Sequence, residues 1–377
     1  MMKRIFNKAP VVDGTAQGGH TIRMPDRVLV HIGAPKTGTT FLQAVLFHNR
    51  ERLGEHGVLV PGKNRLDHGR AATGVRKGPG SKAYRQWRRI VSQARDWAGT
   101  VVISNEWFAM ASAEQARRAM EELAGVETHL LFTARDLVEQ VPAAWQETLK
   151  LGVASSLDEF VHSLDTDEGR WRWSVLDPAP VLDTWRGDLP PEHVHVVTVP
   201  PKGSDSALLW KRFAQVCGID PDSCQTELDQ ARESVGVESA QLLQRAGPLL
   251  RAAIEADAGH WSEPYRWIQR YLSHQLLVPR GGSRIALRPG DFDFLRARSM
   301  ASVDVLKSRG YDVAGDLADL TSAEPSSAAR HPDDVTDSEL LDLALPLIAD
   351  LLGRVRAEVL RADEAEERNV RASDVIG

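Results

Sequence analysis

The stretch "GAPKTGTT", from Gly33 to Thr40, combines two glycines, one lysine and three threonines. It follows the apolar run "RVLVHI" and leads into "TTFLQAVLF", whose apolar residues recur at helical spacing. A strand that turns through glycines into a helix N-terminus presents backbone N–H groups and a positive dipole end to an anion. We therefore expect this loop to bind a phosphate-like group, with Lys36 supplying charge and the threonines supplying hydroxyl donors.

The position of the lysine separates this loop from those of ATPases and GTPases. The pattern GxxxxGK[ST] would place a lysine at Thr39, whereas the lysine here is Lys36, ahead of Gly38. A later strand-like run ends in Asn105-Glu106 rather than in the aspartate that holds Mg²⁺. The sequence therefore indicates a site for a phosphate-like group that requires no metal.

Strand-like runs alternate with helical patterns over the first 220 residues. The runs at 27–33, 99–104, 128–134 and 193–199 are rich in β-branched residues, as expected for strands covered on both faces. Helical patterns lie between them, at 112–123 with a Ser112/Gln115 capping box, at 137–151 and at 205–218. This alternation predicts an α/β, P-loop-type three-layer fold with a mostly parallel central sheet and a helical C-terminal half. Pro142 is expected to kink the helix at 137–151 or to mark its start.

Composition divides the chain into four parts. We expect a flexible N-terminus at 1–25 and one α/β domain at 26–320. The segment 321–336 is rich in Ser, Ala, Pro and Asp, which is typical of a linker. Residues 337–377 predict a helical appendage interrupted by Pro346, which either pairs with a second copy as a homodimer, packs on its own domain or lies loose.

The bulk properties exclude some classes of partner. The 377 residues are 42% hydrophobic and 26% charged with a net charge of −6, so no overall positive charge favours nucleic acid or anionic membranes. No run reaches the roughly 18 apolar residues of a membrane span, and no signal peptide is recognisable. The two cysteines, Cys217 and Cys224, have no neighbouring ligands for a zinc site. These features predict a cytoplasmic protein.

The loop carries a family resemblance. "PKTGTT" after a strand resembles the 5′-phosphosulfate loop of the sulfotransferases that use 3′-phosphoadenosine 5′-phosphosulfate (PAPS). The longer stretch "HIGAPKTGTTFLQAVLFHNRERLGEHGVLVPG" is similar to bacterial, actinobacterial-type members, and weaker similarities extend the match over residues 27–320. The resemblance implies in-line transfer of a sulfuryl group from PAPS to a hydroxyl, or less often an amine, of a small-molecule, glycolipid or sugar acceptor, which leaves adenosine 3′,5′-bisphosphate. It implies that the loop binds the cofactor through Pro35, Lys36, Thr37, Gly38, Thr39 and Thr40, with Lys36 as the catalytic charge stabiliser.

The second anion site of that family is an arginine at a strand end with a serine eight positions later. Arg135 follows the run 128–134 and has the planar fork that binds phosphate in a bidentate manner. Ala143 stands where the serine is expected. Either another group, such as Thr133 or a backbone N–H, completes the site, or Arg135 forms a salt bridge with Asp136 or Glu139.

Sulfuryl transfer to a hydroxyl also requires a base, and two residues are candidates. His68 follows the "GVLVPG" turn, and Glu106 ends the "VVISNEW" run. Trp107 and Trp145 either stack on a ligand ring or belong to the core. The segment 70–95 holds eight Lys or Arg and no acid, which suits a solvated helix or a gate for anions. A P-loop kinase and a non-catalytic nucleotide-binding relative remain the alternative functions.

Overall fold

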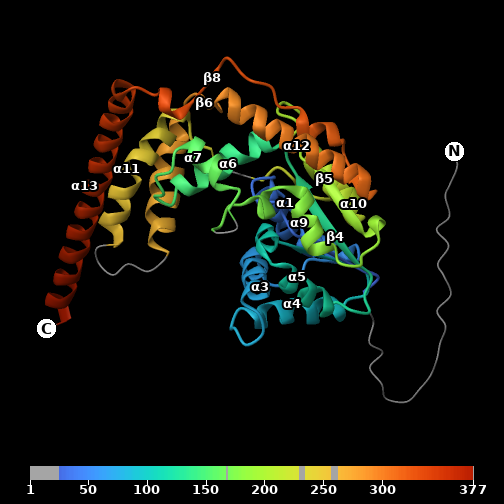
Figure 1. Ribbon diagram of the computed structural model, residues 1–377. Coiled ribbons are helices and arrows are strands. Elements are labelled where there is room, and N and C mark those ends of the chain that lie inside the picture. The colour runs from blue at the N-terminus through green and yellow to red at the C-terminus, as the bar shows by residue number, and fades with distance from the viewer. Residues whose placement is uncertain (1–24, 167–168, 229–233, 256–261, 377) are drawn as a thin grey trace, which may run out of the picture.

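The computed structural model describes residues 25–166, 169–228, 234–255 and 262–376 (Figure 1). The predicted N-terminal segment 1–25 therefore lies outside the described residues except for Pro25. A six-stranded sheet has the order β2-β3-β1-β4-β5-β7, and each of its pairings is parallel. This confirms an α/β fold with a parallel central sheet. Its strands are β1 (Arg27–His31), β2 (Val58–Leu59), β3 (Thr100–Ser104), β4 (Thr128–Ala134), β5 (Val194–Thr198) and β7 (Asp312–Ala314).

Helices cover both faces of this sheet, which explains the continuous apolar runs of its strands. On one face, Leu42 and Phe213 pack from α1 and α10 against Leu29 and Leu131. The other face is covered by α3, α4, α5, α9 and part of α12. The described helices are α1 (Thr39–His48), α2 (Arg50–Glu55), α3 (Arg65–Lys77), α4 (Tyr84–Arg95), α5 (Ala113–Glu121), α6 (Leu137–Leu149), α7 (Leu157–Ser163), α8 (Trp173–Leu176), α9 (Pro178–Arg186), α10 (Leu208–Cys217), α11 (Val237–Glu255), α12 (Pro289–Arg309) and α13 (Asp337–Ile376).

A second apolar core holds a helical lobe beside the sheet (Figure 1). It joins α6, α7 and α11 to the π-helical segment Tyr265–Leu277, through side chains such as Val141 and Trp145. The α6 helix begins at Leu137, where Asp136 caps its N-terminus, and it continues through Pro142. The expectation that Pro142 marks the start of this helix is therefore wrong, because the aspartate cap sets the start.

The C-terminal region differs from its predicted form in one respect. Residues 337–376 form one helix, α13, and Pro346 does not interrupt it. The preceding segment, 321–336, includes β8 (Ala329–Arg330), which pairs with β6 (Arg284–Ile285), and the buried His331, which contacts Asp158 at 2.9 Å. None of the helices in the described parts of the chain combines the length and apolarity needed to cross a membrane.

Candidate active site at the carboxyl end of the sheet

The loop between β1 and α1 is fixed against the neighbouring strand β4. The Ala34 N–H donates to the Thr133 carbonyl at 3.0 Å, and the Thr133 N–H donates to the Gly33 carbonyl at 2.6 Å. A Cβ atom on Gly33 would lie 2.9 Å from the Glu106 carbonyl oxygen, and one on Gly38 would lie 2.5 Å from a Leu209 methyl. Both positions also have positive φ, so the two glycines of the motif are required by the path of the loop.

The loop ends in a helix N-terminus without a side-chain cap. Gly38 occupies the N-cap of α1 in the left-handed conformation, and no side-chain oxygen accepts from the first turn. The first N–H groups of a helix have no partner within it, so they suit an anion. Thr40 is exposed at this end, whereas Thr37 is buried and holds the loop through contacts of 2.5 Å with the Ala34 carbonyl and the Thr133 hydroxyl.

Lys36 is strained and paired. It is the one non-glycine residue with positive φ, at 66°, among the described residues. Such a conformation costs about 1–2 kcal/mol and is found preferentially at functional sites. Its ammonium group lies 3.0 Å from Glu147 on α6. The loop therefore holds Lys36 in one orientation, facing α6.

Glu147 balances more than one positive group. Lys150 contacts the same carboxylate at 2.9 Å, and the Gln269 amide donates to its other oxygen at 2.8 Å. Burial alone would raise the pKa of Glu147, but the charges of Lys36 and Lys150 outweigh this effect and lower the pKa to about 2. Glu147 is thus an anion at any physiological pH, and nothing in the sequence pattern singled it out.

Arg135 reaches the same loop from the end of β4. Its guanidinium donates to the Lys36 carbonyl at 3.0 Å and forms an ion pair with Glu139 at 3.0 Å. Lys202 contacts the other oxygen of Glu139 at 2.7 Å. The predicted contact between Arg135 and Glu139 is therefore present, and the Arg135 side chain also holds the loop between β1 and α1 through the Lys36 carbonyl.

A cavity of about 1100 Å³ opens beside Arg135. Ala143, on α6, lines its wall, so the position without the expected serine faces this space. Further positive groups reach the cavity from distant segments, namely Lys202, Arg284 and Arg296, together with the backbone at Gly281 and Gly282. Sequence reasoning missed Lys202 and Arg284, whose only signals were the short stretches "PPKG" and "RGGSR".

The two candidate bases lie in different environments. Glu106 follows β3, is partly exposed, and accepts a hydrogen bond of 2.8 Å from Gln43 on α1. His68, on α3, is fully buried, and its two ring nitrogens contact Ser104 backbone atoms at 3.1 Å and the Pro61 carbonyl at 2.8 Å. Burial lowers the pKa of His68 to about 4. The structure therefore brings Glu106 to the loop, beside Gly33, and holds His68 among backbone groups of Pro61 and Ser104.

Aromatic groups near Glu106 divide between surface and core. The Arg170 guanidinium lies 3.8 Å from the centre of the partly exposed Trp107 ring, and its charged neighbours include Glu147 and Glu106. Trp145 is fully buried and donates to the Ser155 carbonyl at 2.9 Å, so it belongs to the core. Trp107 and Arg170 therefore lie together on the Glu106 side of the loop.

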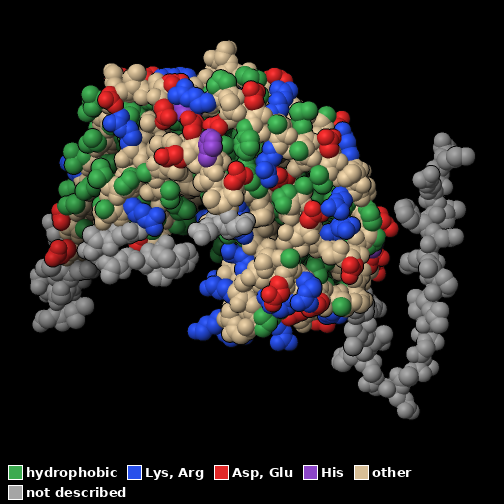
Figure 2. All heavy atoms as spheres, in the orientation of Figure 1, with side chains coloured by type: hydrophobic (Ala, Val, Ile, Leu, Met, Phe, Trp, Pro, Cys, Tyr) green, Lys and Arg blue, Asp and Glu red, His purple; other side chains and the backbone are tan. Residues whose placement is uncertain are grey.

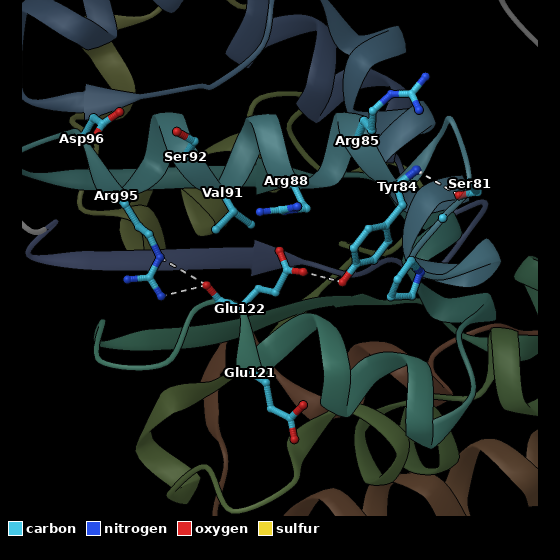
Figure 3. Close-up of a pocket in the computed structure, with 12 residues that line it drawn as sticks. Ser81, Tyr84, Arg85, Arg88, Val91, Ser92, Arg95, Asp96, Glu121 and Glu122 are labelled. Carbon is cyan, nitrogen blue, oxygen red and sulfur yellow. Dashed lines mark hydrogen bonds between the residues drawn. The ribbon is translucent and has the colours of Figure 1, made fainter.

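The basic segment 70–95 forms α3 and α4, and Figure 2 shows Lys and Arg side chains gathered over these helices. A groove of about 990 Å³ lies along α4, with Arg85, Arg88 and Arg95 on one side and Glu122 opposite (Figure 3). Tyr84 donates to the Glu122 carboxylate at 2.5 Å, and Arg95 donates to its carbonyl at 2.8 Å. The groove shares no lining residue with the loop or with the cavity beside Arg135.

Comparison with known proteins adds no relative: no protein-family model, curated protein or solved structure matches this chain.

Proposed function

We propose that this chain is a PAPS-dependent sulfotransferase with a P-loop-type fold. The observation that carries the proposal is the contact between Arg135 and the Lys36 carbonyl, at the adjacent carboxyl ends of β1 and β4. The two side chains expected to bind the cofactor in this family therefore belong to residues in direct contact, and Arg135 also lines a cavity of about 1100 Å³. That volume accommodates a nucleotide.

The residues present fit both anionic ends of PAPS. The N-terminus of α1, Lys36 and Thr40 would bind the 5′-phosphosulfate, since no side chain caps the first turn of this helix. Arg135, with Lys202 and Arg284 across the cavity, would bind the 3′-phosphate in place of the serine absent at Ala143. When bound, PAPS supplies an activated sulfuryl group with a 5′-phosphate leaving group.

We assign each step of the transfer to a residue of the protein. Lys36 stabilises the negative charge on the leaving oxygen, while Glu147 and the strained loop hold its ammonium in place. Glu106 accepts the proton of the attacking acceptor hydroxyl, and Gln43 orients its carboxylate. Trp107 and Arg170 contact the acceptor. The acceptor oxygen forms a bond to sulfur as the bond from sulfur to the 5′-phosphate oxygen breaks.

A P-loop kinase is the second candidate, and three of the carboxylates around the loop argue against it. A kinase needs acidic oxygens that are available to Mg²⁺. Here Glu147 is bound by two lysines, Glu139 by Arg135 and Lys202, and Asp136 caps α6 and accepts from the Ala323 N–H at 2.9 Å.

The test combines binding with transfer. We expect adenosine 3′,5′-bisphosphate to bind by calorimetry and to raise the thermal midpoint more than adenosine 5′-monophosphate or ATP with Mg²⁺. ³⁵S-labelled PAPS should transfer sulfate to one member of a panel of phenols, sugars, glycolipids and amines. Lys36→Ala should lower this transfer by about 100-fold or more and retain the fold. Lys63→Ala, at an exposed lysine outside the loop, is the matched control.

Each contrary result has a separate meaning. Tighter binding of ATP with Mg²⁺ would replace the proposal with the kinase. Binding of the bisphosphate without transfer to any acceptor, water included, would favour a non-catalytic relative. Unchanged transfer by the Lys36→Ala variant would refute the role given to the loop.

A further inference from the structure

A line of four polar side chains crosses the amino ends of β4, β5 and β7, at the edge of the sheet opposite the loop. The Glu127 carboxylate lies 3.0 Å from His129 Nε2, and His129 Nδ1 lies 2.8 Å from His195 Nε2. His195 Nδ1 lies 2.7 Å from the Asp312 carboxylate. Each end of the line is therefore a carboxylate, and the two imidazoles lie between them.

With both imidazoles neutral, the line has too few N–H hydrogens to make all three of its contacts hydrogen bonds. Asp312 can only accept, so His195 donates to it through Nδ1, and His195 Nε2 then accepts from His129 Nδ1. This tautomer leaves a lone pair on His129 Nε2, which faces an acceptor oxygen of Glu127 at 3.0 Å. Two neutral imidazoles supply two hydrogens for three contacts, so the third contact is open to an added proton or to a metal ion.

A third ligand lies beside this contact. The His193 ring stacks on the His129 ring, with centroids 4.1 Å apart and planes inclined by 23°. One ligand atom each from Glu127, His129 and His193 lies within 4.8 Å of the others. His193 and Glu127 reach solvent, so an ion could enter, whereas His129 is buried.

We propose that Glu127, His129 and His193 bind a Zn²⁺ ion at the amino ends of β4 and β5. Two imidazoles and one carboxylate are ligands that Zn²⁺ accepts, with water in the fourth position. His195 and Asp312 form the outer shell, because they fix the tautomer that directs His129 Nε2 at the metal. The ion joins the segment before β5 to β4 and so fastens neighbouring strands.

The experiment uses the full chain without a histidine tag. We expect metal analysis and titration with ZnCl₂ to give one ion per chain, and Zn²⁺ to raise the thermal midpoint where Mg²⁺ does not. X-ray absorption should report N and O ligands, two of them imidazoles, at about 2.0–2.1 Å. His193→Ala and Glu127→Gln should each weaken Zn²⁺ binding about tenfold or more. His56→Ala, at an exposed histidine bonded to a backbone carbonyl, should not.

Two results would overturn the inference. One is the absence of stoichiometric Zn²⁺ binding, which would leave a proton at the contact. The other is binding that survives both ligand variants, which would place the ion elsewhere, such as at Asp158, His331 and Asp333. Because the cluster lies at the opposite edge from Lys36, nucleotide binding should be equal in wild type and His193→Ala. The zinc experiment therefore tests this inference independently of the proposed function.

Discussion

At the scale of single residues, burial separates groups that the sequence left equivalent. His68 and Glu106 were both candidate bases, the first after the "GVLVPG" turn and the second at the end of a strand-like run. The fold surrounds His68 with backbone partners and packs its ring on Phe47 with centroids 4.9 Å apart. Glu106 keeps one partner, Gln43, and partial exposure. A base must reach the proton that it removes, so the structure favours Glu106.

The first prediction from this difference concerns paired substitutions. Glu106→Gln should lower kcat by about 100-fold or more and leave the thermal midpoint nearly unchanged. His68→Ala should lower the free energy of unfolding by about 2–4 kcal/mol, because it creates a cavity and removes partners from buried backbone groups. Its kcat per folded molecule should persist. Kinetics with the acceptor identified from the panel, together with urea denaturation, measure both. Loss of kcat in a fully folded His68→Ala protein would reverse the assignment.

At the scale of elements, the length of a strand and the residues at a helix end decide whether the element can be predicted from the sequence. The strands β1, β3, β4 and β5 have five residues or more, and each was predicted. The strands β2 and β7 have two and three residues and were missed, because so short a run shows no periodicity. The start of α6 was ambiguous because Pro142 is a strong local signal, whereas the true start depends on the Asp136 cap.

On α6, Ala143 stands where the family pattern has serine, and this difference can be tested. Ala143 lines the cavity that Arg135 borders, so a hydroxyl at this position would face the same space. We expect Ala143→Ser to tighten binding of adenosine 3′,5′-bisphosphate by about tenfold, since a hydrogen bond to a charged group contributes about 1.5–3 kcal/mol. Calorimetry measures the change. Affinity for adenosine 5′-monophosphate, which lacks the 3′-phosphate, should stay constant, and a parallel gain for both nucleotides would contradict a 3′-phosphate site here.

At the scale of the whole molecule, α13 presents two apolar stripes. Leu347 is buried against the helical lobe, which contains α6 and α11. A second stripe faces solvent, and Figure 2 shows apolar side chains along this side of the molecule. Its members are Leu341, Leu345, Ile348, Leu352, Val355 and Val359, each 52–68% exposed and spaced alternately by four and three residues. This is the spacing of a coiled-coil seam.

We propose that a second copy of the chain covers the exposed stripe in an antiparallel pairing. With Ile348 opposite Leu352 of the other copy, Asp342 lies beside Arg356 of the other copy, so the flanking charges are complementary. We expect a dimer by light scattering. Ile348→Asp combined with Leu352→Asp should give a monomer with a similar fold, whereas Leu360→Asp, an exposed apolar residue off the seam, should not. A monomeric wild type at micromolar concentration would refute the pairing.

The sequence by itself determined the alternation of strands and helices, the glycine loop before a helix, and the roles open to Lys36 and Arg135. These depend on local spacing and on the chemistry of single side chains, which the chain order fixes. Only the tertiary structure decided that Glu147 holds Lys36, that Lys202 and Arg284 face Arg135, and that His129, His193 and His195 meet Glu127 and Asp312. The hydrogen-bonded pairs Lys36–Glu147 and His195–Asp312 are 111 and 117 positions apart, and the tertiary arrangement of the strands, not sequence spacing, brings them together.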